Sequence, residues 1–277
     1  MLKFQKKQEE YVLSKFRLLS IFLLCALALP VIAGCGNTTP PEVTDVNNTD
    51  APITDTPTEE VTDPATEPVT DAPKGPLTIV CVGDSITEGV GASNASQYSY
   101  PAQLQKLLGD SYKVVNCGKS KATALGSNSK YWNTNGIYYN TTAQYKGALA
   151  SDPDIVLIML GTNDAKHVTG SDTESVDQFY NALKELGKTF EALESKPQIY
   201  IMASPYRFED AARKANMDSA IYPTQKKLAE DMGWGFIDLF AVTKSAMKSQ
   251  KIHSDSLHFN DDGYAVIAEA IKAELTK

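Results

Sequence analysis

Apolar runs and helical patterns alternate along residues 77–277 of this chain. Five apolar runs predict β-strands, over Leu77–Val82, Tyr112–Cys117, Asp154–Leu160, Gln198–Ala203 and Gly235–Phe240. The segments between them have the spacing of amphipathic helices, over Tyr100–Leu108, Thr142–Ala150, Ser175–Leu193, Tyr222–Met232 and Asp261–Leu275. Strands that alternate with helices favour a parallel sheet covered on both faces. The pattern therefore predicts an α/β fold, a three-layer α/β/α sandwich with a five-stranded parallel sheet.

The N-terminal segment has a different character. Basic side chains in residues 1–17 precede an apolar stretch over 18–34, and Cys35 follows Ile32-Ala33-Gly34. This order is typical of a secretory signal, and a cysteine after Ala-Gly resembles the lipobox of bacterial lipoproteins. We expect a signal peptide over 1–34, a lipid on Cys35, and a protein anchored to the bacterial cell membrane outside the cytoplasm. An uncleaved transmembrane anchor is the alternative, because the apolar stretch approaches the spanning length.

Residues 36–76 are rich in Thr, Pro, Asp and Glu and contain no aromatic side chain. Such a segment buries too little apolar surface to offset the entropy of ordering it, so with Cys35 it should form a disordered stalk over 35–76. Nine acidic side chains and one lysine in 36–76 account for the whole formal net charge of −8. Residues 77–277 are close to neutral, so the predicted folded domain lacks a basic surface for nucleic acid.

Two cysteines, Cys81 and Cys117, lie in predicted strands that could be neighbours. A disulfide between them is conceivable, but adjacent strands seldom place two cysteines at disulfide geometry, which favours buried free thiols. No cysteine and histidine cluster has the spacing of metal ligands. We expect neither a metal nor a cofactor.

One serine, Ser85, closely follows a predicted strand and has the partners that nucleophilic catalysis requires elsewhere in the chain. The first predicted strand leads into Gly83-Asp84-Ser85, and Asp255 lies three residues before His258 near the C-terminus. A serine hydroxyl attacks an ester when a base takes its proton, and a carboxylate orients that base. The chain supplies all three groups, which predicts a serine hydrolase with Ser85 as nucleophile, His258 as base and Asp255 as carboxylate. As purely structural residues, Ser85 would cap a helix and Asp255 a turn.

Four blocks in chain order resemble those of the SGNH (GDSL) hydrolases: Gly83-Asp84-Ser85, Asn116-Cys117-Gly118, Gly161-Thr162-Asn163-Asp164 and Asp255…His258. The resemblance spans residues 77–277 and implies the flavodoxin-like fold of that family. It also implies an oxyanion hole formed by the backbone N–H groups of Ser85 and Gly118 and the side-chain amide of Asn163. A glycine at 118 would let the backbone approach the substrate without a Cβ atom.

The second block departs from the family pattern after its glycine. It often continues as Gly-x-Ser-Gly-x-Thr, whereas Lys121 stands here at the position of the second glycine. This lysine puts the turn of the loop in question and places a cation near the pocket. We expect Asp84 to stabilise its own turn through the backbone. His167 and His253 are the other histidines that could serve as base, and His167 has no acid at the helpful spacing.

The segment Tyr131–Asn140 is rich in aromatic and amide side chains. These suit sugar rings, because aromatics stack on C–H faces and amides bind hydroxyls. Alternatively, the segment packs back onto the domain. The chain resembles SGNH carbohydrate O-acetylesterases, so we expect removal of small acyl groups, acetyl in particular, from an extracellular glycan. A lysophospholipase or general short-chain arylesterase is the alternative enzyme, and a non-catalytic glycan-binding module is the alternative from another class.

Overall fold

The structure of the protein is a computed structural model that describes residues 75–206 and 211–277. The predicted signal peptide, Cys35 and nearly all of the predicted stalk lie outside these residues. Among the helices of the described ranges, none has both the length and the apolar character needed to cross a bilayer.

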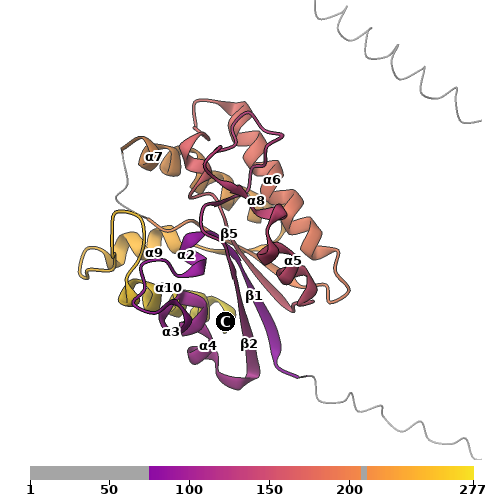
Figure 1. Ribbon diagram of the computed structural model, residues 1–277, viewed down its shortest axis with the longest axis vertical. Helices are drawn as coiled ribbons and strands as arrows, with labels where there is room; N and C mark the ends of the chain where they lie inside the picture. Colours follow the sequence, from indigo (N-terminus) through magenta and orange to yellow (C-terminus); the bar gives the residue numbers. More distant parts are fainter. Residues whose placement is uncertain (1–74, 207–210) are drawn as a thin grey trace, which may run out of the picture. The chain divides into compact units, whose positions relative to one another are not determined.

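A five-stranded parallel sheet forms the middle layer (Figure 1). Its strands lie in the order β2-β1-β5-β6-β7. The chain thus adds β2 on one side of β1 and then places the later strands on the other side, which is the flavodoxin-like order. The predicted fold class is therefore confirmed. The strands are β1 (Leu77–Gly83), β2 (Tyr112–Gly118), β5 (Ile155–Met159), β6 (Gln198–Met202) and β7 (Gly235–Ile237).

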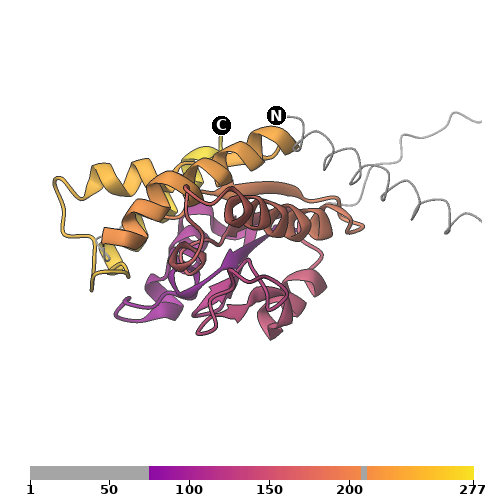
Figure 2. The same ribbon diagram turned by 90° about the horizontal axis from the view of Figure 1, so that it is seen from above.

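Helices cover both faces of this sheet (Figures 1 and 2). Val80 and Val82 of β1 enter one core, whereas Ile79 and Cys81 enter the other, because successive side chains of a strand point to opposite faces. The first core packs against α5 (Ala143–Ala150), α6 (Thr173–Glu191) and α8 (Tyr222–Met232). The second packs against α4 (Tyr100–Leu108), α9 (Leu239–Ala246) and α10 (Asp261–Leu275).

Shorter elements connect these layers. A small parallel pair, β3 (Ala122–Thr123) and β4 (Ile137–Tyr138), flanks the loop that follows β2. The remaining helical elements are α2 (Ser85–Glu88), α3 (Ala95–Tyr98), η1 (Gly109–Ser111), η2 (Tyr139–Thr141), η3 (Asp164–Lys166), α7 (Ala211–Asn216) and the π-helical η4 (Met217–Ile221).

One predicted strand boundary is wrong. The apolar run over Gly235–Phe240 ends as a strand at Ile237, and Phe240 lies in α9. The Asp238 side chain accepts a hydrogen bond from the backbone N–H of Ala241 at 2.9 Å. This is the bond of a helix N-cap, so Asp238 ends the strand and begins the helix.

The two cysteines of the folded part are buried free thiols, as the strand argument favoured. The register of β1 and β2 places Val82, not Cys81, opposite Cys117. Cys81 therefore faces the core under α10, while Cys117 faces the core on the opposite side of the sheet.

Candidate active site

Three loops with predicted site residues meet at the carboxyl edge of the sheet. Gly83, the last residue of β1, pairs with Gly118 of β2 and with Met159 of β5. Ser85 follows β1 and Asn163 follows β5. Strand order reverses at β1, and ligands of such sheets bind outside the carboxyl ends of the strands at that point.

Asp84 fixes the turn that carries Ser85. It is the N-cap of α2, and its Oδ1 accepts a hydrogen bond from the backbone N–H of Ile86 at 2.9 Å. The expectation that Asp84 stabilises its own turn is thereby confirmed. Ser85 opens α2 with only 7% of its surface exposed, so its hydroxyl lies in a partly desolvated position.

His258 lies between Ser85 and Asp255. Its Nε2 is 3.0 Å from Ser85 Oγ, and its Nδ1 is 2.9 Å from Asp255 Oδ2. The other carboxylate oxygen, Oδ1, accepts the backbone N–H groups of Leu257 at 2.7 Å and His258 at 2.6 Å. One carboxylate therefore holds both the ring and the backbone of the same histidine.

The charge of Asp255 is stabilised by these contacts. Partial burial alone would raise the pKa of its carboxyl, but the hydrogen bonds from His258 and Leu257 outweigh that effect and lower the pKa to about 2. The side chain is ionised at neutral pH and can stabilise an imidazolium at His258.

A closed loop presents Asp255 and His258 to the serine. His253 and Phe259 form an antiparallel bridge, and the backbone N–H of Ser254 donates to the carbonyl of His258 at 3.0 Å. Gly91 has φ of +95°, and a Cβ there would lie 2.3 Å from Ser254 Oγ. The glycine therefore permits the close approach of this loop to the chain that follows α2.

The other two histidines lie elsewhere. His167 is exposed after η3, and the ring of His253 packs on Phe259 with centroids 4.4 Å apart. Among the described residues, His258 is the histidine within hydrogen-bond distance of Ser85 Oγ. The same residues contain no group of three or more His, Cys, Asp or Glu side chains placed to hold a metal ion.

Two of the three predicted oxyanion donors, Gly118 and Asn163, already donate a hydrogen bond within the protein. The backbone N–H of Gly118 donates to Asn116 Oδ1 at 2.9 Å. Asn163 Nδ2 donates to the carbonyl of Ala122 at 2.9 Å, and its second amide hydrogen is left for a ligand. Asn116 must share or release the Gly118 N–H before that group can bind an oxyanion.

Glycine at 118 is required for a reason other than the expected approach to substrate. A Cβ on Gly118 would lie 2.2 Å from the backbone nitrogen of Glu88 and 2.6 Å from the carbonyl carbon of Thr87. The absent side chain therefore makes room for α2, the helix that carries the serine.

Two carboxylates organise the loop after β2, half-buried Glu88 and buried Asp164, and the sequence pattern gave no sign of this role. Glu88 Oε2 accepts the backbone N–H of Ser120 at 2.7 Å and also its hydroxyl. Asp164, fully buried, accepts the backbone N–H groups of Ala124 at 3.1 Å and Leu125 at 3.0 Å. Asp164 belongs to the third sequence block and Glu88 ends the helix that follows the first, but only the folded chain shows which loop they hold.

The Tyr131–Asn140 segment packs largely onto the domain. Tyr131 and Trp132 are half-buried against the core, and the Tyr131 hydroxyl donates to Asp172 Oδ2 at 2.7 Å. Asn133 is buried, and its Nδ2 donates to the carbonyl of Asn163 at 3.4 Å. The two aromatic rings therefore pack onto the domain, which was the alternative expected for this segment. The amide of Asn133, in contrast, contacts the backbone of Asn163 at the candidate site.

Comparison with known proteins defines the class of this chain. The model of the GDSL-like lipase/acylhydrolase family matches residues 81–266. The chain belongs to that family, which confirms the resemblance found in the sequence.

Several of the proteins that this chain resembles are carbohydrate esterases. An acetylxylan esterase from Xylanibacter ruminicola is 32% identical over 215 residues, covering 72% of this chain and 43% of that protein; the chain thus spans less than half of its length. The structure of Axe2, an acetylxylan esterase from Geobacillus stearothermophilus, has a TM-score of 0.54 at 23% identity over 73% of this chain and 96% of its own. A carbohydrate acetylesterase family member from Sinorhizobium meliloti has a TM-score of 0.51 at 19% identity, covering 72% and 97%. These two structures show likeness of fold.

Proposed function

We propose that this protein is a serine esterase that hydrolyses short acyl esters, acetyl in particular, on extracellular carbohydrate. The observation that carries the proposal is the contact of His258 Nε2 with Ser85 Oγ at 3.0 Å, beside a carboxylate on the other ring nitrogen. Membership of an acylhydrolase family and the acetylxylan esterase relative support the same reaction class.

The acylation step uses the Ser85–His258–Asp255 triad. Ser85 Oγ attacks the ester carbonyl carbon while His258 Nε2 takes the hydroxyl proton. Asp255 holds the ring and stabilises the imidazolium that results. When the tetrahedral intermediate collapses, the bond to the sugar oxygen breaks, and His258 returns the proton to that oxygen. The products of this half-reaction are a free sugar hydroxyl and acyl-Ser85.

Deacylation repeats the step with water as the nucleophile. His258 takes a proton from water as its oxygen attacks the acyl carbon, and then protonates Ser85 Oγ as the acyl–serine bond breaks. The carboxylic acid leaves and Ser85 is restored. The three groups thereby complete the cycle without a cofactor.

The negative oxygen of each intermediate needs preorganised donors. We assign the backbone N–H groups of Ser85 and Gly118 and the amide of Asn163 to this role. Asn163 Nδ2 supports the assignment because one of its hydrogens anchors it to Ala122 while the other can point to a ligand. The Gly118 N–H can contribute once its hydrogen bond to Asn116 Oδ1 is shared or broken.

The substrate class is tested by acetate release and by acyl-chain length. We expect acetate release from at least one of acetylated xylan, pectin, peptidoglycan or sialosides, and faster cleavage of p-nitrophenyl acetate than of the octanoate. Ser85→Ala should abolish both activities. A steep preference for long chains would favour the lysophospholipase alternative. Glycan binding without ester cleavage by the unaltered protein would favour a binding module.

We also propose that Cys35 carries a lipid that anchors the protein to the membrane outside the cytoplasm, because the residues before it have the order of a lipoprotein signal. Cells given radiolabelled palmitate should label the unaltered protein and not Cys35→Ser, which should leave the membrane fraction. Equal labelling of both proteins would refute the anchor without affecting the assignment of the catalytic groups.

A further inference from the structure

A polar hollow lies between α6 and the segment 124–129. It has a volume of about 320 Å³, and neither Ser85 nor His258 lines it. We name it the amide groove, after the side chains that give it its polar character, which are Asn128, Ser129, Tyr138, Gln178, Asn181 and Glu185.

These side chains match an uncharged, polyhydroxylated ligand. Asn128, Asn181 and Glu185 are exposed, and within the described part of the chain none of their side chains has a hydrogen-bond partner. Amides donate and accept and a carboxylate accepts, so together they complement hydroxyl groups. Tyr138 adds an aromatic face of the kind that packs on sugar rings. Neither lysine nor arginine lines the groove in the described residues, so an anionic ligand gains nothing there.

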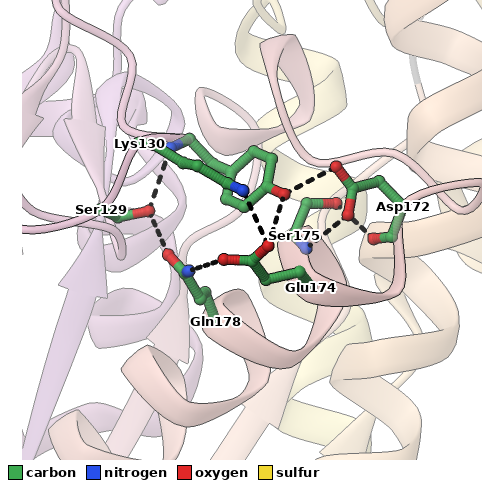
Figure 3. A network of polar contacts seen from close by, with 7 residues as sticks. Ser129, Lys130, Asp172, Glu174, Ser175 and Gln178 are labelled. Carbon is green, nitrogen blue, oxygen red and sulfur yellow. Dashed lines mark hydrogen bonds and ion pairs between the residues drawn. The ribbon is translucent and has the colours of Figure 1, made fainter. Parts of the chain in front are cut away.

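The groove has a fixed wall (Figure 3). Ser129 Oγ donates to Gln178 Oε1 at 2.6 Å, and Gln178 Nε2 donates to Glu174 Oε1 at 3.1 Å. Lys130 forms an ion pair with Glu174 at 2.7 Å. These contacts join the loop to the first turns of α6, so little ordering remains to be done when a ligand binds.

The tyrosine of the groove is also held in place. A Cβ on Gly126 would lie 2.8 Å from the ring of Tyr138, so this ring packs directly on the glycine backbone. The Tyr138 hydroxyl accepts a hydrogen bond from Asn140 Nδ2 at 3.0 Å. The aromatic face therefore has a defined orientation.

Hydrogen bonds connect the wall of the groove to the loop that carries Asn163. Ala124 and Leu125 line the groove, and their N–H groups bind the carboxylate of Asp164, next to Asn163 in the chain. A polysaccharide long enough to extend from Ser85 past this segment would place unreacted sugar units in the groove.

We propose that the amide groove is an accessory site for the neutral sugar backbone of an acetylated polysaccharide. The proposal rests on the function proposed above, since it specifies where the unreacted part of that substrate binds. It predicts a preference for acetylated oligosaccharides over acetylated monosaccharides.

The test separates binding from catalysis. Calorimetric titration of Ser85→Ala protein with xylohexaose and mannohexaose, both free of acetyl groups, should detect binding of at least one of them. Adding Asn181→Ala or Glu185→Ala should weaken it about fivefold, the effect of one hydrogen bond. Gln198→Ala, an exposed amide at the amino end of β6, is the matched control and should leave binding unchanged. Thermal melting checks that each variant is folded.

A kinetic split gives the second readout. In protein that retains Ser85, Asn181→Ala should raise KM for an acetylated hexasaccharide more than KM for an acetylated monosaccharide. Equal affinity of the groove variants and the control, or failure of both hexasaccharides to bind, would refute the proposal that the groove binds sugar. If a hexasaccharide binds but the unaltered protein releases no acetate from any acetylated glycan, the proposed esterase function is refuted, while sugar binding by the groove is retained.

Discussion

At the scale of single residues, contact with Asp255 distinguishes His258, the proposed base, from the other histidines. Its two oxygens bind the ring Nδ1 and the backbone N–H of His258, so the imidazole is held with Nε2 toward Ser85. His167 is exposed and has no such contact with an acid among the described residues. The difference between these histidines lies in their neighbours.

Replacing each histidine in turn tests this distinction. His258→Ala should lower kcat for p-nitrophenyl acetate by on the order of 10⁴ or more, because loss of a triad base costs at least as much as loss of its carboxylate. His167→Ala should leave kcat within about twofold, because surface changes remote from the reacting groups have small effects. Similar losses in both variants would show that the base has been misassigned.

Lys121 occupies a backbone conformation that favours glycine. Its φ is +66°, in the left-handed region that costs an L-residue about 1–2 kcal/mol. That geometry explains why the family pattern has glycine at this position. The sequence left open whether the loop could turn here with a lysine, and the structure shows that it does.

Lys121→Gly should therefore stabilise the protein. Relief of the strain, less the added entropy of glycine in the unfolded chain, predicts a gain of about 0.5–1 kcal/mol in the free energy of unfolding, measured by urea denaturation. Lys121→Ala removes the same charge but keeps the strain, so it should show no gain. An equal gain in both variants would assign the effect to the ammonium group.

At the scale of elements, the loop after β2 is held from several directions. Glu88 of α2 binds Ser120, Asn163 binds the carbonyl of Ala122, and Asp164 binds the next two N–H groups. The loop that carries Gly118 is therefore positioned by the elements that also carry the serine and the amide. Loss of any one of these hydrogen bonds should disturb the proposed oxyanion hole before it disturbs the fold.

Because Asp164 holds this loop, its titration makes the free energy of unfolding depend on pH. Burial raises the pKa of its carboxyl to about 7, although the N–H groups of Leu125 and Ala124 oppose the rise. An unfolded aspartate titrates near about 4. Between these values the unfolded chain releases the proton and the folded chain keeps it, so the free energy of unfolding falls as pH rises.

Asp164→Asn removes this titration. The stability of the unaltered protein relative to the variant should therefore be greatest near pH 4 and should decline up to pH 7, as measured by urea denaturation at several pH values. The depressed pKa of Asp255 acts below about pH 4 and is the same in both proteins, so it cancels. A difference that stays constant or grows with pH would contradict the buried-acid account.

The elements themselves were largely predictable from the pattern of apolar positions. Phe179, Leu183, Leu186 and Phe190 face the core from α6, as their spacing required, because a helix repeats every 3.6 residues. The pattern failed at Gly235–Phe240, where an apolar run crosses from a strand into a helix and only the capping role of Asp238 marks the boundary. The short helix α2 was hidden because four residues are too few to show a period.

At the scale of the whole molecule, strand order creates the candidate site. Placing β1 between β2 and β5 brings three of the four sequence blocks to one edge of the sheet, and α10 follows the loop that carries the fourth. Each of these three blocks lies at the end of a predicted strand, and the carboxyl ends of parallel strands lie at one edge, so the order of elements is enough to predict this convergence. Glu88, Asn116 and Asp164 could not be assigned in the same way, since their partners are distant in sequence or depend on the exact turn of a loop.

We infer that folding makes Ser85 a nucleophile by placing His258 against it. A fluorophosphonate reacts with an activated serine and leaves a covalent phosphonyl group on its oxygen. Peptide mass spectrometry of the treated protein therefore identifies which serine is activated. We expect one label, on Ser85, in the unaltered protein and in His167→Ala, and almost none in His258→Ala. A label on another residue, or undiminished labelling of Ser85 without His258, would refute the inference.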